Sequence, residues 1–325
     1  MWGKFSNAFS NIFKKQLHNK NTDIILKEDK DGIKGKVKKS TPIFKTVGPV
    51  ALWLITFFIV PLLLVLVVSF LSRGEYGDVR LPFTLKNYKR LMDPMYGQIL
   101  IKTLIISIST TLGCLLIGYP FAYFIGRANK KHRGLLLLLV ILPFWTNSLV
   151  RTYAWIILLK TEGVINTYLM RFGLIDAPMQ MLYTDGAVFI GMLYIMLPFM
   201  VLPIYTSIEK LDMSYIEAAN DLGASPYKTF KEITLPLTLP GIIAGCMLVF
   251  IPTLGYFFIS DLMGGSKTML ISNLIKNQFL TSRDWPFGSA IAVILIILML
   301  IAIGFYFKGN KPKKEQRRLA NDEKQ

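Results

Sequence analysis

Three adjacent aromatic residues, Tyr256, Phe257 and Phe258, stand shortly before a carboxylate, Asp261. Aromatic faces and a carboxylate together suit an ammonium group, because cation-π attraction and an ionic contact can act on the same cation. Successive residues turn about 100° around a helix, so at least one ring must point into a packed interior. The alternative is that the rings only pack against other helices while Asp261 caps a helix, and the sequence leaves both open.

A second polar group interrupts the apolar segment that runs from 135 to 159. Its arginine, Arg151, must face a partner or water, because an isolated charge is costly inside apolar surroundings. If the bound molecule is a cation, we expect Arg151 to be paired and structural, since it would repel that cation. Trp145 is a candidate for the binding path, with a place in an interfacial aromatic belt as the alternative.

Catalytic signatures are missing from the sequence. His18 and His132 are its two histidines, and they stand in separate basic segments, so no His/Cys/carboxylate cluster with metal-ligand spacing can be assembled. The run from Gly264 to Lys267 lacks the order and spacing of a Walker A phosphate loop. We therefore predict no enzyme activity, no cofactor and no metal, and any ATP hydrolysis must come from a partner chain.

The segment from Glu217 to Pro236 reads EAANDLGASPYKTFKEITLP and predicts two short helices. Ser214 and Glu217 have capping-box spacing, so the first helix should begin there. Gly223 suits the left-handed residue that ends a helix, and Ser225 followed by Pro226 suits the start of the next. The alternative is a plain turn in which Glu217 only caps.

Long apolar runs determine the class of the protein. The chain is 53% hydrophobic with a mean hydropathy of +0.46. Each run is long enough to cross a hydrocarbon layer about 30 Å thick, so we predict an all-α polytopic membrane protein with six transmembrane helices. The spans are Val47–Leu71, Ile99–Gly126, Leu135–Leu159, Ala187–Ile208, Leu237–Ser260 and Ser289–Phe307.

The distribution of lysine and arginine predicts the orientation. The N-terminal segment 1–46, the loop 127–134, the segment 209–236 and the C-terminal segment 308–325 together carry 25 of these residues. The three alternate loops carry 10. The positive-inside rule therefore places both termini and segment 209–236 in the cytoplasm. The net charge of +17 is then an orientation signal and a match to anionic lipid, and we expect no nucleic-acid partner.

The N-terminal segment 1–46 is the part whose role is least defined. Apolar residues recur at helical spacing between lysines near its start, which suits a helix in the membrane interface as well as it suits a disordered tail. Because the first apolar run begins late and is long, we expect it to remain as an anchor and not to be cleaved. The apolar residues are Trp2, Phe5, Phe9, Ile12 and Phe13.

The segment from Glu217 to Pro236 resembles the EAA loop of ATP-binding-cassette importer permeases. It has the family's EAA, three residues, glycine, nine residues and then I-x-L-P. The resemblance implies that segment 209–236, here called the coupling loop, docks on an ATPase subunit. The residues carried over for coupling are Glu217, Ala218, Ala219, Gly223 and Pro236.

Three segments resemble spermidine/putrescine importer permeases of the PotB type, namely 142–159, 218–225 and 261–290. With the six-span layout, the similarity covers about residues 45 to 308. It implies a type I importer (MetI-like) permease fold over residues 47–307, in a bacterial inner membrane. It also implies a homologous second permease, an ABC ATPase dimer and an extracytoplasmic polyamine-binding protein as partners. Because EAA loops also occur in permeases for iron, thiosulfate, phosphonates or sugars, another small solute is the alternative cargo.

Overall fold

The computed structural model describes residues 43–75 and 77–309, which are mostly helical. They fall into two compact units that meet between Ile59 and Val60. In the first unit, the helix α2 (Ile43–Leu54) continues into a π-helical turn, η1 (Ile55–Ile59), and the rings of Trp53 and Phe57 lie tilted to each other with 5.2 Å between their centroids. The interfacial helix expected near the N-terminus and the segment from 310 onward lie outside the described residues.

Five helices are long and apolar enough to cross a membrane. A sixth crossing exists if the pair Lys130–Trp145 and Ser148–Arg171, which is bent by 90°, counts as one span. The predicted third span is therefore not a straight helix. The five uninterrupted spans are Gly48–Ser69, Pro94–Arg127, Asp185–Glu209, Pro226–Gly255 and Trp285–Phe307.

The bend in the third span has a local cause. Helix α6 (Lys130–Ile141) passes into a 3-10 turn, η2 (Leu142–Trp145), that contains Pro143, and Thr146 is extended with ψ 149°. The side chain of Asn147 then accepts a hydrogen bond from Leu149 N at 2.8 Å and begins a new helix, α7 (Ser148–Leu159). Proline removes a backbone donor and Asn147 caps, so two short helices replace one long helix.

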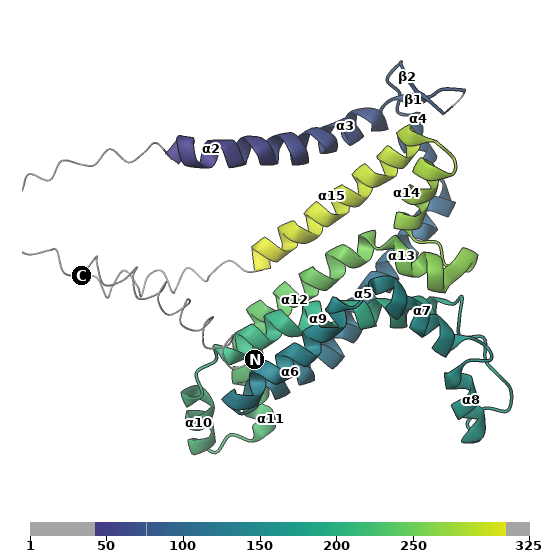
Figure 1. Ribbon diagram of the computed structural model, residues 1–325. Helices are drawn as coiled ribbons and strands as arrows, with labels where there is room; N and C mark the ends of the chain where they lie inside the picture. Colours follow the sequence, from purple (N-terminus) through teal and green to yellow (C-terminus); the bar gives the residue numbers. More distant parts are fainter. Residues whose placement is uncertain (1–42, 76, 310–325) are drawn as a thin grey trace, which may run out of the picture. The chain divides into compact units, whose positions relative to one another are not determined.

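Three helices form the centre of the second unit: α5 (Pro94–Arg127), α9 (Asp185–Glu209) and α12 (Leu235–Gly255), which lie side by side in Figure 1. Helix α9 is the most deeply buried of the candidate spans. Its core face carries four fully buried side chains, Met192, Met196, Met200 and Ile204, at the spacing of successive helical turns. The free cysteine Cys114 is buried in this cluster.

A second, smaller hydrophobic cluster joins α14 (Ile271–Leu280) to α15 (Trp285–Gly309) and to the end of α12. Phe287 is fully buried there, and Arg90 lies 3.9 Å from the centroid of its ring while bonding to Asp284 at 2.8 Å. Helix α15 also packs along α3 (Val60–Ser69). Residues between α3 and α5 form a small antiparallel hairpin and a short helix: β1 (Ser72–Arg73), β2 (Val79–Arg80) and α4 (Lys86–Arg90).

Short helices and turns connect the spans. Helix α8 (Val164–Arg171) follows α7, and Thr184 caps α9 by accepting from Ala187 N at 3.2 Å. At the other end of α9, the coupling loop forms α10 (Ser214–Asp221), α11 (Pro226–Thr229) and the π-helical segment η3 (Phe230–Thr234) before α12 begins. After α12 come α13 (Phe257–Ile259), a π-helical segment η4 (Ser260–Gly264) and a 3-10 turn η5 (Gly265–Lys267).

Candidate functional site: the coupling loop and a polar break in the fifth span

The first helix of the coupling loop begins at Ser214, as predicted, but its cap differs from the prediction. Met213 occupies the N-cap position and makes no side-chain cap. Asp212 caps the start of the helix instead, because its Oδ1 accepts a hydrogen bond from Ser214 N at 3.0 Å. The predicted capping box between Ser214 and Glu217 is therefore wrong. Glu217 is exposed, so its carboxylate is available to a partner.

Gly223 ends that helix in the left-handed conformation, with φ +77°, which confirms the prediction from the sequence. A residue with a Cβ is strained in this region, whereas glycine is not. The backbone closes around it, with Gly223 N donating to Asn220 O at 2.9 Å and Ala224 N donating to Ala219 O at 3.0 Å. Ser225 then caps the next helix by accepting from Lys228 N at 3.4 Å, with Pro226 in its first turn.

The second helix of the coupling loop is not a separate short helix, as the sequence suggested. It runs without a break from Pro226 to Gly255 and so becomes the fifth span. Pro236 lacks a backbone N–H, and the π-helical segment η3 directly precedes the turn that contains it. From Pro226 onward, the coupling loop and the fifth span therefore form one continuous helix.

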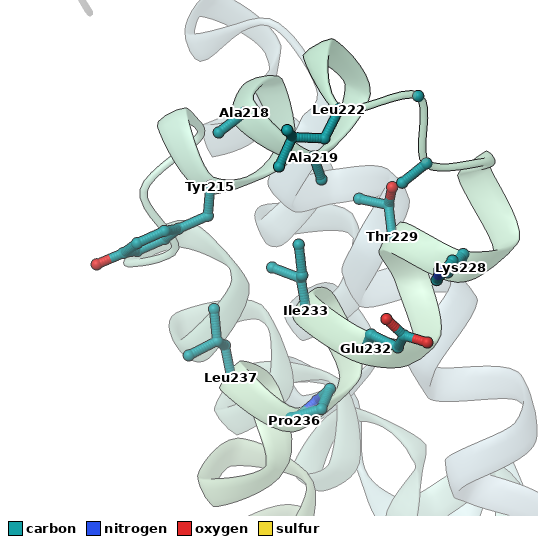
Figure 2. A pocket seen from close by; sticks show the side chains of 12 residues that line it. Tyr215, Ala218, Ala219, Leu222, Lys228, Thr229, Glu232, Ile233, Pro236 and Leu237 are labelled. Carbon is teal, nitrogen blue, oxygen red and sulfur yellow. The ribbon is translucent and has the colours of Figure 1, made fainter.

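A groove of about 740 Å³ lies between α10 and the helix that starts at Pro226. Figure 2 shows Ile233 pointing from η3 toward the helix that carries Ala219, while the Glu232 carboxylate turns away. Four of the five coupling residues expected from the sequence line this groove, and Glu217 lies beside it. These four are Ala218, Ala219, Gly223 and Pro236.

The two alanines of the groove differ in exposure. Ala219 is 7% exposed and packs inward, whereas Ala218 is exposed on the rim. Three large residues that sequence reasoning missed are also exposed around the loop: Leu222 at 88%, Tyr227 at 73% and Tyr215 at 56%. These exposed side chains are available for contact with a partner. Their spacing in the sequence gives no periodic signal, because they come from different turns.

The fifth span breaks where the sequence placed its aromatic residues. Helix α12 ends at Gly255, and Tyr256 is extended with ψ 91° before α13 resumes. The predicted continuation of this span to Ser260 therefore includes a break. Tyr256 and Phe258 pack against the main hydrophobic cluster, as expected for at least one of the three rings, while Phe257 is 41% exposed.

Asp261 lies in η4 and has partners on the following helix, α14. Its carboxylate accepts a hydrogen bond from Asn273 and forms an ion pair with Lys276. Asn273 in turn accepts from Ser260 and donates to Phe257 O at 3.0 Å. Sequence reasoning missed Lys276 and Asn273, because they are separated from Asp261 by a turn whose path only the fold defines.

The bend in the third span contributes two further groups. Trp145, at the end of η2, is 74% exposed, whereas Ser148 just beyond the bend lies 3.4 Å from the Tyr256 hydroxyl. The Arg151 guanidinium lies 5.7 Å from the centroid of Phe144 and 5.8 Å from that of Tyr194. Its Nε is buried with no hydrogen-bond partner among the described residues. Arg151 is thus held by aromatic faces, and no paired carboxylate was found for it within residues 43–75 and 77–309.

Comparison with known proteins gives the family. Residues 118–310 match the model of the binding-protein-dependent transport system inner membrane component. The chain is 50% identical over 259 residues to the spermidine/putrescine transport system permease protein PotB of Escherichia coli (strain K12), covering 80% of this chain and 94% of that protein. It is 49% identical over 275 residues to PotB of Salmonella typhimurium (strain LT2), covering 84% and 96%.

A solved structure of another importer shares the fold. A chain of a bacterial ABC transporter involved in the import of the acidic polysaccharide alginate aligns with a TM-score of 0.66 and 18% identity, covering 83% of this chain and 96% of that one. Together the helical architecture, the coupling loop and these matches establish that the chain belongs to the binding-protein-dependent transport system inner membrane components and, within them, to the PotB-type permeases.

Proposed function

We propose that this chain is the permease subunit of an ATP-driven spermidine/putrescine importer and forms half of its translocation path. The observation that carries the substrate class is the identity of about half of all aligned residues with PotB permeases over nearly their whole length. Ammonium chemistry in the fifth span supports it, since Asp261 and Phe257 offer a carboxylate and an aromatic face. The chain is a transport subunit and not an enzyme.

ATP enters the cycle through partners. As a binding-protein-dependent component, the chain works with an ATPase and a periplasmic binding protein. We infer that the ATPase is a dimer, that a homologous second permease completes the path, and that the binding protein carries polyamines. The basic residues support a cytoplasmic position for both termini and the coupling loop. The inner membrane is the location of the family.

The geometry of the loop supports a proposal for how ATP binding is coupled to transport. The exposed Glu217 and Ala218 and the groove beside them form the contact surface for the ATPase. Closure of the ATPase dimer on ATP displaces α10, and the continuous helix from Pro226 carries that displacement into the fifth span. ATP can drive transport only if this helix has two stable arrangements. ATP and the substrate must each bind one arrangement more tightly than the other, and they must differ in which one they favour.

We assign the substrate path to the polar break, meaning the interruption of the helix at Tyr256 and the residues that follow it up to Asp261. Tyr256, Phe257, Phe258 and Asp261 lie where α12 ends, and Trp145 lies at the bend of the third span. Backbone that is not helical is tolerated inside a membrane where it is covered by protein or lines an aqueous cavity. Two such breaks, joined by the contact of Ser148 with Tyr256, support a path for a hydrophilic cation.

Uptake of radiolabelled spermidine tests the proposal. The complete complex is reconstituted in vesicles with polyamine-loaded binding protein, with ATP or with a non-hydrolysable analogue. We expect accumulation only with ATP, and competition by putrescine but not by thiosulfate, a phosphonate or a sugar. Accumulation that does not need ATP would refute the importer, and competition by another solute alone would refute the polyamine assignment.

A further inference from the structure

We propose that residues 79–95, here called the anchor segment, lie in the outer surface of the bilayer, with apolar side chains inserted among the lipids and lysines on anionic lipid headgroups. The segment connects the end of the first span to the start of the second. The inference goes beyond the proposed function, because it concerns a lipid partner and not the cargo or the ATPase.

Large apolar side chains are exposed along the anchor segment. Leu81, Phe83 and Leu85, at alternate positions, are 73%, 66% and 60% exposed. Met92 and Met95, further along the segment, are exposed as well. Exposed apolar side chains this close together in the chain indicate contact with lipid or with another protein. The depth and the charge of the segment decide between the two.

Hydrogen bonds fix the depth of the anchor segment. The first candidate span ends at Ser69. Thr84 N donates to Phe70 O at 2.6 Å, directly beyond that end. Asn87 Nδ2 donates to Ser69 O at 3.0 Å and to Leu71 O at 2.9 Å. The anchor segment therefore lies where the span leaves the hydrocarbon layer, which is the depth at which interfacial segments insert their apolar side chains.

Two lysines supply the charge that matches a lipid surface. Lys86 and Lys89 stand on α4 and are both exposed, and neither forms an ion pair with another residue in 43–75 or 77–309. A lysine at the bilayer surface is attracted to anionic lipid, and its long apolar stem lets the ammonium reach the headgroups. Leucine, phenylalanine and lysine at this depth favour lipid, whereas contact with a soluble binding protein does not require this depth.

The tip of the neighbouring hairpin has the opposite character. Glu75 and Asp78 are exposed there, and Asp78 forms an ion pair with Arg80 at 2.8 Å. Carboxylates are repelled by an anionic surface, so the tip faces water while the anchor segment faces lipid. Glu75 therefore gives an internal control from the same connection between spans.

The anchor segment is bonded to the last span as well as to the first. Arg90 bonds to Asp284, whose Oδ1 accepts from Phe287 N at 3.2 Å and so caps α15. Nearby in β1, Arg73 donates to Ser282 O at 2.7 Å. Insertion of the anchor segment thus holds the outer ends of α3 and α15 at one depth in the bilayer.

Photocrosslinking identifies what covers the anchor segment. Phe83 is replaced by p-benzoylphenylalanine, and the complete complex is irradiated in vesicles of equal parts phosphatidylcholine and phosphatidylglycerol, with the binding protein present. We expect lipid adducts on this chain, detected by mass. The same replacement of Glu75, or of Leu222 in the coupling loop, should give none. If the variant at Phe83 does not assemble, Leu81 takes its place.

Two results would overturn the insertion. One is the absence of lipid adducts at Phe83, with or without a crosslink to the binding protein or to another subunit in their place. The other is a yield of lipid adducts at Glu75 equal to that at Phe83. The measurement does not depend on ATP or on uptake, so failure of the proposed polyamine transport would leave its outcome unchanged.

The composition of the adducts tests the lysines. The ratio of phosphatidylglycerol to phosphatidylcholine in the adducts should exceed that of the bilayer by about fivefold. In the Lys86→Gln/Lys89→Gln variant it should fall to the ratio of the bilayer. The control Lys130→Gln/Lys131→Gln removes two exposed lysines from the loop 127–134 and should leave the enrichment unchanged. Adducts with the bilayer's own ratio in the wild type, or equal enrichment in the Lys86→Gln/Lys89→Gln variant, would overturn the headgroup contact.

Discussion

The ring of Phe230 meets the ring of Tyr119 edge-on, with 5.7 Å between the centroids and 84° between the planes. Phe230 belongs to the coupling loop and Tyr119 to α5, so the contact joins the loop to a second span. The Tyr119 hydroxyl lies 3.1 Å from that of Thr238 on α12, in a buried hydrogen bond. A displacement of the loop therefore reaches α5 and α12 together.

Replacing Phe230 with a smaller residue should weaken the coupling of transport to ATP hydrolysis. An edge-to-face aromatic pair contributes about 1 kcal/mol beyond its buried area, so we predict that Phe230→Ala lowers spermidine transported per ATP by about fivefold. Phe230→Tyr should retain most of it. The measurement compares uptake and ATP hydrolysis in the same vesicles, with the exposed Phe124→Ala on α5 as control. Equal transport per ATP in all three variants would show that the Phe230–Tyr119 ring pair does not contribute to coupling.

A substitution at Gly223 tests the bend of the coupling loop through backbone conformation alone. No atom lies within 4 Å of a Cβ built at this position, so the cost of a side chain comes from φ +77° and is about 1–2 kcal/mol. We predict that Gly223→Val reduces ATPase retention on the complex, while Gly223→Asn retains it better, since asparagine tolerates the left-handed region. Gly173, with φ +65° and equally open space, supplies the control Gly173→Val. ATPase retention equal to the wild type in Gly223→Val would remove the bend from the docking surface.

The crossing of α12 over α9 depends on the absence of a side chain at Gly241. A Cβ there would lie 2.3 Å from Ser207 Oγ and 2.7 Å from Pro203 O, and the carbonyl cannot move aside cheaply. We predict that Gly241→Ala destabilises the protein by about 2 kcal/mol and lowers the melting temperature by several degrees. Gly304→Ala, with nothing within 4 Å, should melt at or above the wild-type temperature. Equal melting of both variants would contradict the close crossing.

Asp212 should give the start of α10 a dependence on pH. Hydrogen bonds from Ser214, first from its backbone N–H and then from its side chain, hold the pKa of the Asp212 carboxyl below its ordinary value of 3.8. A depressed pKa in the folded state means that the stabilisation is fully present above about pH 4 and is lost as the pH falls through the folded value.

Hydrogen exchange at the first turn of α10 measures this effect. At neutral pH we expect less protection in Asp212→Ala than in the wild type, with Asp212→Asn between them because the amide oxygen still accepts. The difference between wild type and Asp212→Ala should begin to shrink as the pH falls below about 4. A difference that is constant down to pH 3 would exclude the carboxylate as its source.

Much of this molecule could be predicted from the residues in order. Apolar runs longer than a core helix needs indicated a membrane-spanning helical protein, and five of the six predicted spans contain a helix long and apolar enough to cross a membrane. The left-handed Gly223 and the cap at Ser225 followed from local chemistry, because a turn of this kind depends on the few residues that form it. The motif spacing from Glu217 to Pro236 indicated the coupling loop for the same reason.

The tertiary structure decided what distant residues do to one another. The sequence left Asp261 open between contact with a cation and a helix cap, and the fold brought Lys276 and Asn273 to it. The sequence also predicted a cap at Ser214, whereas Asp212 caps the start of the helix. The third span bends by 90°, and the coupling loop continues from Pro226 into the fifth span as one helix. A hydropathy profile detects neither feature. Hydropathy and local propensity sum over neighbours in sequence, whereas ion pairs, breaks and continuity depend on the path of the chain in space.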